Sequence, residues 1–246
     1  PLRQISPAVP HAFRLAPQPA SGILPPMTPL PDIEIAGLDL AFAGRTILHD
    51  FSLQVAAGEK VVLAGASGSG KSSLLACLLG FLFPPAGRIA IRGELVTPKS
   101  VWRLRRAMAL VQQEPDLGEQ TVAEWIEEPF TFRANESLRG HLAQLPGLLR
   151  RLRLDPAILR QKGPALSGGE KQRIALASAL LLDRPILLLD EPASALDPES
   201  RQAVYDGLAD LEGQTLLMVS HDPSSALRFV DRTVRLSPPE DDHGRA

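Results

Sequence analysis

The clearest indication of the architecture comes from two adjoining stretches, Lys60-Val-Val-Leu-Ala64 and Gly65-Ala-Ser-Gly-Ser-Gly-Lys-Ser72. The first is apolar after Lys60 and predicts a short strand that is buried on both faces. The second matches the pattern G-x-x-x-x-G-K-S/T, and the apolar residues after it predict a helix through Leu79. Such a loop lets successive backbone N–H groups face a phosphate at the helix N-terminus. The sequence therefore predicts a nucleotide site.

Two side chains of this loop carry specific chemistry. Lys71 would reach the β- and γ-phosphates, and the Ser72 hydroxyl would ligate Mg²⁺. The candidate nucleotide contacts are Gly65, Ala66, Ser67, Gly68, Ser69, Gly70, Lys71, Ser72 and Ser73. The alternative is a Gly/Ser turn that merely contains a lysine, and the predicted strand and helix on either side argue against it.

A second apolar strand is predicted at Ile186–Leu189, and it ends in Asp190-Glu191. A buried strand that delivers a carboxylate at its carboxyl end can place a Mg²⁺ ligand, here Asp190. Glu191 can then face the attacking water as general base. The alternative is an acidic strand end with no role in catalysis.

The segment Leu166-Ser-Gly-Gly-Glu-Lys-Gln-Arg173 begins another predicted helix, which extends to about Leu182. Ser167 and Glu170 have the spacing of a capping box. Two glycines just inside a helix cost roughly 1 kcal/mol each relative to alanine. Their presence indicates that a ligand approaches this backbone closely, and an anion suits a helix N-terminus.

This segment resembles the signature of the ABC (ATP-binding cassette) ATPase family, which reads LSGGQ where this chain has LSGGE. The resemblance covers residues 33–236, approximately. It implies an α/β fold: a P-loop NTPase core with a mostly parallel sheet, an N-terminal antiparallel β subdomain and an inserted small helical subdomain. In that family the signature binds the γ-phosphate of the ATP held by the other subunit. The resemblance therefore assigns Ser167, Gly168 and Gly169 to nucleotide binding across a dimer.

Four further positions match the motifs of that family. Phe42 takes the place of the aromatic residue that stacks on adenine, although it would equally fit an apolar core. Gln113, or its neighbour Gln112, resembles the glutamine that contacts Mg²⁺ or water. Asp197 resembles the loop along the dimer seam, and by itself is typical of a helix N-cap before Pro198. His221 resembles the histidine that touches the γ-phosphate, although a lone histidine is more often structural.

The domain organisation follows from changes in pattern along the chain. Nine prolines in residues 1–31 predict a disordered extension. Residues 32–237 are predicted to form the ATPase domain, which begins with an antiparallel strand pair at Ile33–Leu40 and Ile47–Val55. Leu, Arg and Ala at helical spacing predict a helical subdomain over about 115–165. Residues 238–246 are expected to form a flexible tail.

Composition restricts the partners. The formal net charge of −2 gives no electrostatic footprint for nucleic acid. The longest apolar run, Leu74–Phe83, is about half as long as a bilayer-spanning helix, so no membrane insertion is expected. The single cysteine, Cys77, excludes an internal disulfide.

The resemblance implies a homodimer that binds ATP and Mg²⁺ and drives a separate integral membrane permease. The chain would then lie in the cytoplasm, peripheral to the inner or plasma membrane. Short stretches around Glu114-Pro115 and Gly118–Trp125 look most like small cassettes of an iron-export group. Importer-type and lipoprotein-type cassettes remain open, as does a soluble ABC ATPase that assembles a protein or iron–sulfur scaffold. Trp125 and Phe130–Phe132 would line the groove for the permease or form local core.

Overall fold

The computed structural model describes residues 30–42, 45–221 and 228–236. The predicted proline-rich extension falls outside these residues except for Leu30 and Pro31, and the predicted tail falls wholly outside them. The strands are β1 (Ile33–Phe42), β2 (Arg45–Val55), β3 (Lys60–Ala64), β4 (Ala86–Ile91), β5 (Glu94–Leu95), β6 (Met108–Val111), β7 (Ile186–Asp190), β8 (Thr215–Ser220) and β9 (Arg232–Arg235). The helices are α1 (Lys71–Leu78), α2 (Val101–Leu104), α3 (Val122–Glu127), α4 (Leu145–Arg151), α5 (Gly168–Leu181) and α6 (Pro198–Ala209). Shorter 3₁₀ segments are η1 (Arg105–Ala107), η2 (Glu128–Thr131), η3 (Arg133–Gln144), η4 (Pro156–Arg160) and η5 (Gly163–Ala165).

The centre of the molecule is a parallel sheet in the order β6-β7-β8-β3-β9. Alternate residues of its inner strands enter two different cores. In β7, Leu187 and Leu189 face one core, whereas Ile186 and Leu188 face the other. Burial on both faces explains why β3, β7 and β8 are almost wholly apolar in sequence.

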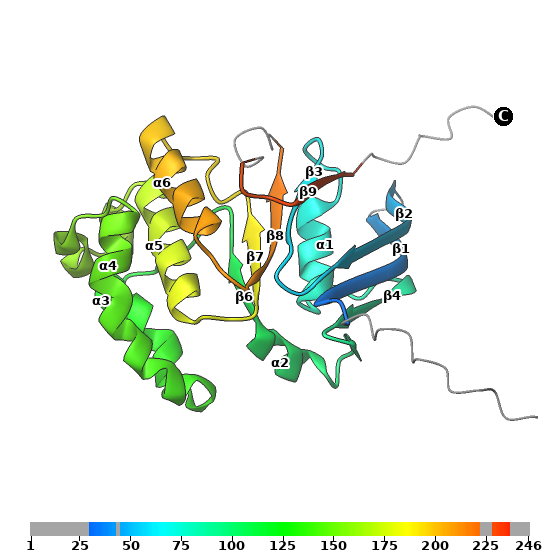
Figure 1. Ribbon diagram of the computed structural model, residues 1–246, viewed down its shortest axis with the longest axis horizontal. Helices are drawn as coiled ribbons and strands as arrows, with labels where there is room; N and C mark the ends of the chain where they lie inside the picture. The colour runs from blue at the N-terminus through cyan, green and yellow to red at the C-terminus, as the bar shows by residue number, and fades with distance from the viewer. Residues whose placement is uncertain (1–29, 43–44, 222–227, 237–246) are drawn as a thin grey trace, which may run out of the picture.

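A second, antiparallel sheet has the order β2-β1-β4-β5. Figure 1 shows α1 lying between this sheet and the parallel sheet. Leu74 and Leu78 of α1 are buried in one cluster with Ile33 of β1 and Leu188 of β7. The helix that follows the phosphate loop is thus fixed from both sides.

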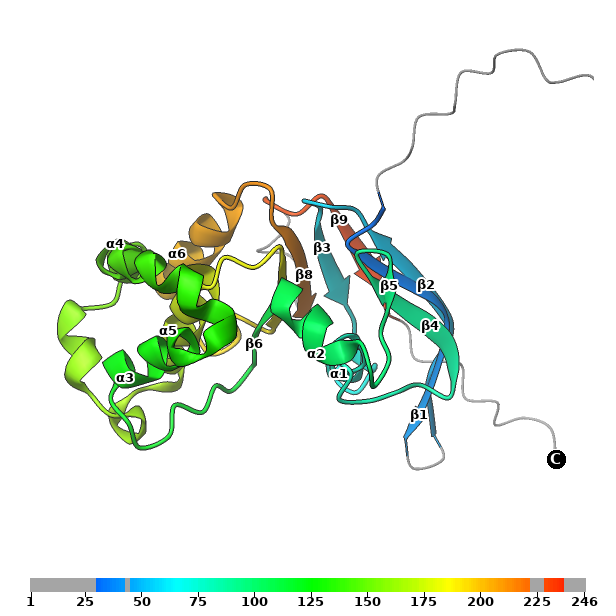
Figure 2. The same cartoon turned by 90° about the horizontal axis from the view of Figure 1, so that it is seen from below.

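The helices between β6 and β7 gather on the far side of the parallel sheet from the antiparallel sheet (Figure 2). Their core is continuous with that of α5 and the sheet, and Phe130 is 1% exposed within it. Trp125 packs partly buried against the same cluster, whereas Phe132 is 57% exposed. Of the aromatics proposed for a permease groove, Phe130 is therefore core and only Phe132 is fully at the surface.

The structure confirms the predicted fold class, with its P-loop core, antiparallel sheet and inserted helices. Most predicted elements lie within a few residues of their expected bounds. They are the antiparallel strand pair, the strands before the phosphate loop and before Asp190, and the helices that begin at Lys71, Gly168 and Pro198. The sequence patterns did not predict α2, β5, β6 or β9. Among the described residues no helix is long and apolar enough to cross a membrane.

Candidate nucleotide site

A cavity of about 590 Å³ opens at the carboxyl ends of β3 and β7. Its walls come from segments that lie far apart in the sequence. They are Ile47, Ser67, Gly68, Gly70, Lys71, Ser72, Ser73, Gln113, Glu191 and His221. The fold therefore assembles most of the predicted phosphate loop, Gln113, Glu191 and His221 around one space.

The Lys71 side chain is buried and folds back over the loop. Its Nζ donates hydrogen bonds to the carbonyl oxygens of Gly65, at 2.8 Å, and Ala66, at 2.9 Å. Both bonds hold a positive charge against the cavity wall, where an anion can take over its hydrogen bonds. Because these carbonyl partners are neutral, the positive charge of Lys71 remains available to an anion.

Glycine is required in the loop for two physical reasons. Gly68 and Gly70 have φ of 77° and 90°, a conformation that side chains disfavour. A Cβ on Gly70 would also lie 2.3 Å from Cγ2 of Ile47 in β2. Ile47, which the sequence analysis did not include in the site, thus packs against the loop and fixes its position.

Asp190 lies behind the loop at the end of β7. The Ser72 side chain hydrogen-bonds to it, and its Oδ1 is buried with no hydrogen-bond partner among the described residues. Burial raises the pKa of Asp190, against the opposing effects of Ser72 and Lys71. The unpaired carboxylate oxygen of Asp190 and the neighbouring Ser72 hydroxyl are together suitable ligands for a hard cation.

Glu191 adopts an unusual backbone conformation, with φ of 50°. Its backbone N–H donates to the Val219 carbonyl at 3.0 Å, and its carbonyl accepts bonds from Gln172 Nε2 at 2.6 Å and Ser194 Oγ at 3.1 Å. Its carboxylate is 11% exposed and pairs with Nδ1 of His221. These bonds aim the carboxylate at the cavity.

Gln172 is a residue of the site that the sequence analysis missed. It is 1% exposed, and besides Glu191 its Nε2 reaches the Gln113 carbonyl at 3.4 Å. One side chain of α5 therefore touches the segments carrying Glu191 and Gln113. Its presence in the quoted signature segment was the only signal in the sequence, because no local pattern shows which way it points.

The structure places Gln113, and not Gln112, among the residues that line the cavity. Phe42 ends β1, but its side chain lies outside the described part of the structure. Asp197 caps α6, accepting bonds from the backbone N–H groups of Glu199 and Ser200 at 3.0 Å. Its N-cap geometry is confirmed, and it is not part of the cavity wall.

The signature residues Ser167, Gly168 and Gly169 do not line the cavity of their own chain. The predicted capping box is confirmed: Ser167 accepts from the Glu170 N–H at 3.3 Å, and Glu170 Oε2 accepts from the Ser167 N–H at 2.9 Å. A Cβ placed on Gly168 would meet nothing within 4 Å. Ser167 and Gly168 are exposed, whereas a Cβ on Gly169 would lie 3.0 Å from Leu196 of the same chain.

Comparison with known proteins identifies the family. A family model described as "ABC transporter" matches residues 48–194, more than half of the chain, and this range includes the loop, Gln113, the signature and Glu191. The chain belongs to the ABC transporter family. It is an ABC cassette that binds ATP and hydrolyses it to drive transport.

This cassette is similar to several import proteins. The thiamine import ATP-binding protein ThiQ of Shigella boydii is 40% identical over 205 residues, covering 80% of this chain and 84% of ThiQ. The Fe(3+) ions import ATP-binding protein FbpC 2 of Rhodococcus jostii is 37% identical, covering 83% of this chain and 59% of FbpC 2. Because both are import proteins, the expected iron-export group is not supported.

Among solved structures, the cassette resembles the dimeric structure of the ATP-binding cassette MJ0796 bound to ADP and Pi. The TM-score is 0.72 and the identity 28%, covering 83% of this chain and 94% of MJ0796. MJ0796 is a dimer in that structure.

Proposed function

We propose that this cassette is the ATP-hydrolysing subunit of an importer for a small solute or metal ion, working as a homodimer beneath a separate permease. The observation that carries the proposal is the division of the site. One chain gathers Lys71, Glu191 and His221 around its cavity but leaves the exposed Ser167–Gly169 helix end outside it. Two chains facing head to tail would complete both cavities.

Lys71 and the loop would bind the phosphates. Gly68 and Gly70, with positive φ, line the cavity, where their loop can offer backbone N–H groups to phosphate, and the α1 N-terminus adds a favourable dipole. Lys71 would exchange its bonds to Gly65 and Ala66 for bonds to the β- and γ-phosphates. The Ser167–Gly169 helix end of the second chain would then approach the γ-phosphate from the open side of the cavity.

The residues present also fit Mg²⁺. Ser72, Asp190 and Gln113 offer the hydroxyl, carboxylate and amide oxygens that this cation prefers. When bound, Mg²⁺ would neutralise charge that develops on the β- and γ-phosphates. Asp190 Oδ1 is buried without a hydrogen-bond partner among the described residues, and a bound cation would supply that missing interaction.

Glu191 and His221 would perform the proton chemistry. The Glu191 carboxylate, held at the cavity wall, would accept a proton from the attacking water. His221 pairs with that carboxylate and so restrains it, and the His221 side chain is 59% exposed and lines the cavity. Moving away from Glu191, it would reach the γ-phosphate.

The importer assignment rests on the import proteins ThiQ and FbpC 2. In this proposal the permease selects the solute, and the cassette lies on the cytoplasmic face of the membrane through its contact with the permease. Nothing in the nucleotide cavity distinguishes thiamine from ferric ion as cargo.

The test is reconstitution. Affinity purification from solubilised membranes of the source cells should recover a polytopic membrane protein with the cassette. Proteoliposomes carrying that complex should take up thiamine or ferric ion only with ATP on the cassette side, and Glu191→Gln should retain ATP binding while lowering kcat by roughly 100-fold or more. Full turnover in Glu191→Gln would remove Glu191 as the base. ATP-driven efflux of the same solutes would contradict the importer assignment.

A further inference from the structure

A second groove lies near the amino ends of the parallel strands, whereas the nucleotide cavity opens at their carboxyl ends. The volume of this groove is about 310 Å³, and its walls are Arg92, Arg103, Arg106, Ala107, Arg184 and Pro185. Arg106 and Arg184 come just before the first residues of β6 and β7, whereas the nucleotide cavity opens where the parallel strands end. The groove is therefore independent of the ATP site.

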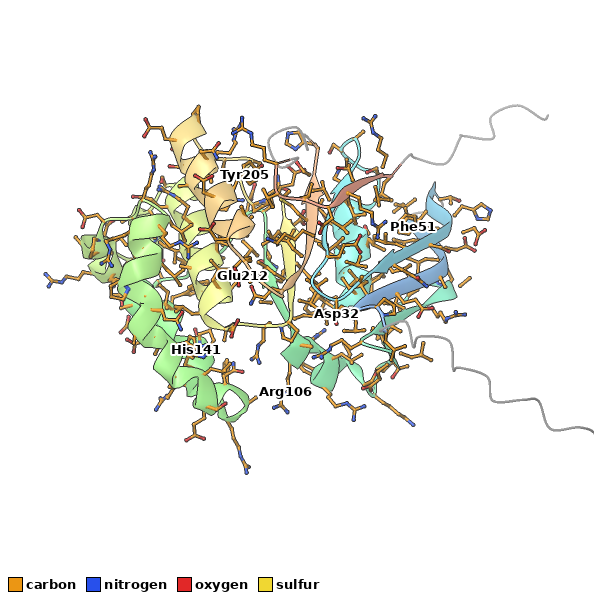
Figure 3. The ribbon with its side chains drawn as sticks, viewed as in Figure 1. Asp32, Phe51, Arg106, His141, Tyr205 and Glu212 are labelled. Atoms are coloured by element: carbon orange, nitrogen blue, oxygen red, sulfur yellow. The ribbon has the colours of Figure 1, made fainter. Side chains whose placement is uncertain are left out.

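The charges of this groove are only partly balanced. Arg103 pairs with Glu94, and Arg92 pairs with Asp32 at 3.4 Å. Arg106 is exposed and Arg184 is half-buried, and neither has an ion pair among the described residues. Figure 3 shows Arg106 projecting from the edge of the molecule beside α2. Two guanidinium groups at one groove thus lack a carboxylate among these residues.

The surroundings of Arg184 disfavour its positive charge. Burial, together with repulsion from Arg106, lowers the pKa of Arg184. The side chain is nevertheless held in place, because its Nη2 donates to Oδ1 of Asn135, which is itself buried. A guanidinium that is fixed, partly desolvated and repelled by a neighbouring cation is arranged to receive an anion.

The chemistry of the groove favours a phosphate group. A guanidinium presents a rigid fork of donors that matches carboxylate or phosphate. Four guanidinium groups from three separate segments suit a tetrahedral anion, whose several oxygens can accept bonds at once, better than a planar carboxylate with two oxygens. The segment that supplies two of them, residues 95–113, contains no acidic residue.

We propose that the groove formed by Arg92, Arg103, Arg106 and Arg184 binds a phosphate group, presented by an anionic phospholipid headgroup or by a soluble phosphate ester. Trp102, next to Arg103 in α2, is 73% exposed, and tryptophan is enriched at the polar boundary of membranes. This observation favours the lipid as the source of the phosphate. The inference does not rest on the proposed import function.

The test compares Arg106→Glu with Arg160→Glu. Arg160 is an exposed arginine of η4 without an ion pair among the described residues, so both variants change the net charge equally. Binding is measured to phosphatidylglycerol vesicles and, separately, to glycerol 3-phosphate. A saturating non-hydrolysable ATP analogue with Mg²⁺ occupies the nucleotide cavity throughout. We expect Arg106→Glu to weaken binding about tenfold or more, with ATPase activity unchanged, and Arg160→Glu to resemble the wild type.

The two arms separate the sources of the phosphate. Loss of vesicle binding alone supports a headgroup, and loss of glycerol 3-phosphate binding supports a soluble ester. If Arg106→Glu and Arg160→Glu bind both probes alike, the groove is not a phosphate site. If polyglutamate displaces the bound phosphate probe at equal concentration of charge, the groove selects acidic protein segments, and the phosphate assignment is wrong.

Discussion

At the residue scale, the backbone of Glu191 is the most informative feature of the site. A left-handed conformation costs a non-glycine residue roughly 1–2 kcal/mol. It persists here because Val219, Gln172 and Ser194 all hydrogen-bond to its backbone. We therefore regard Gln172 as a positioning residue, which acts on the chemistry through Glu191 and not by touching the nucleotide.

Replacing Gln172 tests this role. Gln172→Met keeps the length of the buried side chain but removes the donor to the Glu191 carbonyl. We expect kcat to fall about tenfold, equivalent to roughly 1.4 kcal/mol, with the KM for ATP nearly unchanged, because Lys71 and the loop are untouched. Steady-state ATPase kinetics measure both constants, and a variant that folds and keeps the wild-type kcat would show that Gln172 does not position Glu191.

At the element scale, α5 joins two parts of the proposed mechanism. Its exposed N-terminus carries Ser167–Gly169, and within its first turns Gln172 contacts the backbone of Glu191 and Gln113. The capping box fixes where this helix begins. A displacement of α5 would thus move both the signature and Gln172, which contacts the cavity segments of the same chain.

The capping box makes a prediction about pH. Hydrogen bonds from the Ser167 backbone and hydroxyl hold the pKa of Glu170 below its usual value. A carboxyl group whose pKa is lowered by folding stabilises the protein above its unfolded pKa, about 4.3, and this contribution is lost as the pH falls through the folded pKa. The amide oxygen of a glutamine in its place would still accept the bonds, but the side chain would not titrate.

Urea unfolding at neutral pH and near pH 3 should therefore show a larger loss of stability for the wild type than for Glu170→Gln. The expected difference is at most about 1 kcal/mol, the usual value of a helix cap. Glu212→Gln, at an exposed glutamate between α6 and β8, controls for the change of charge. Equal acid sensitivity of the wild type and Glu170→Gln would refute the contribution of this carboxylate.

At the scale of the whole molecule, a feature could be predicted from the sequence when the residues that form it are close together along the chain. The strand–loop–helix unit at Lys60–Leu78 was predictable because its apolar run, glycines and lysine are contiguous. Strand β6 was missed because four apolar residues fit a helix or a strand equally, and β9 because Arg232 and Arg235 make it polar and exposed. The contacts of Gln172 and Ile47 depend on packing between distant segments, which local patterns do not encode.

The central claim, that two chains complete each nucleotide pocket, also concerns the whole molecule and can be tested with two variants. Lys71→Ala removes the cation from one side of the pocket. Gly168→Val fills the open space in front of the signature without a clash inside its own chain. Each variant alone should be folded and nearly inactive, because in its homodimer both pockets carry the defect.

The most direct measurement mixes these two variants, with the membrane subunit supplied, and records ATP hydrolysis. Random exchange of chains puts both defects into one pocket of each mixed dimer and leaves the other pocket intact. Activity should then recover to roughly a quarter of the wild-type value. A folded Gly168→Val variant with full activity on its own, or a mixture no more active than its separate components, would contradict the shared pocket.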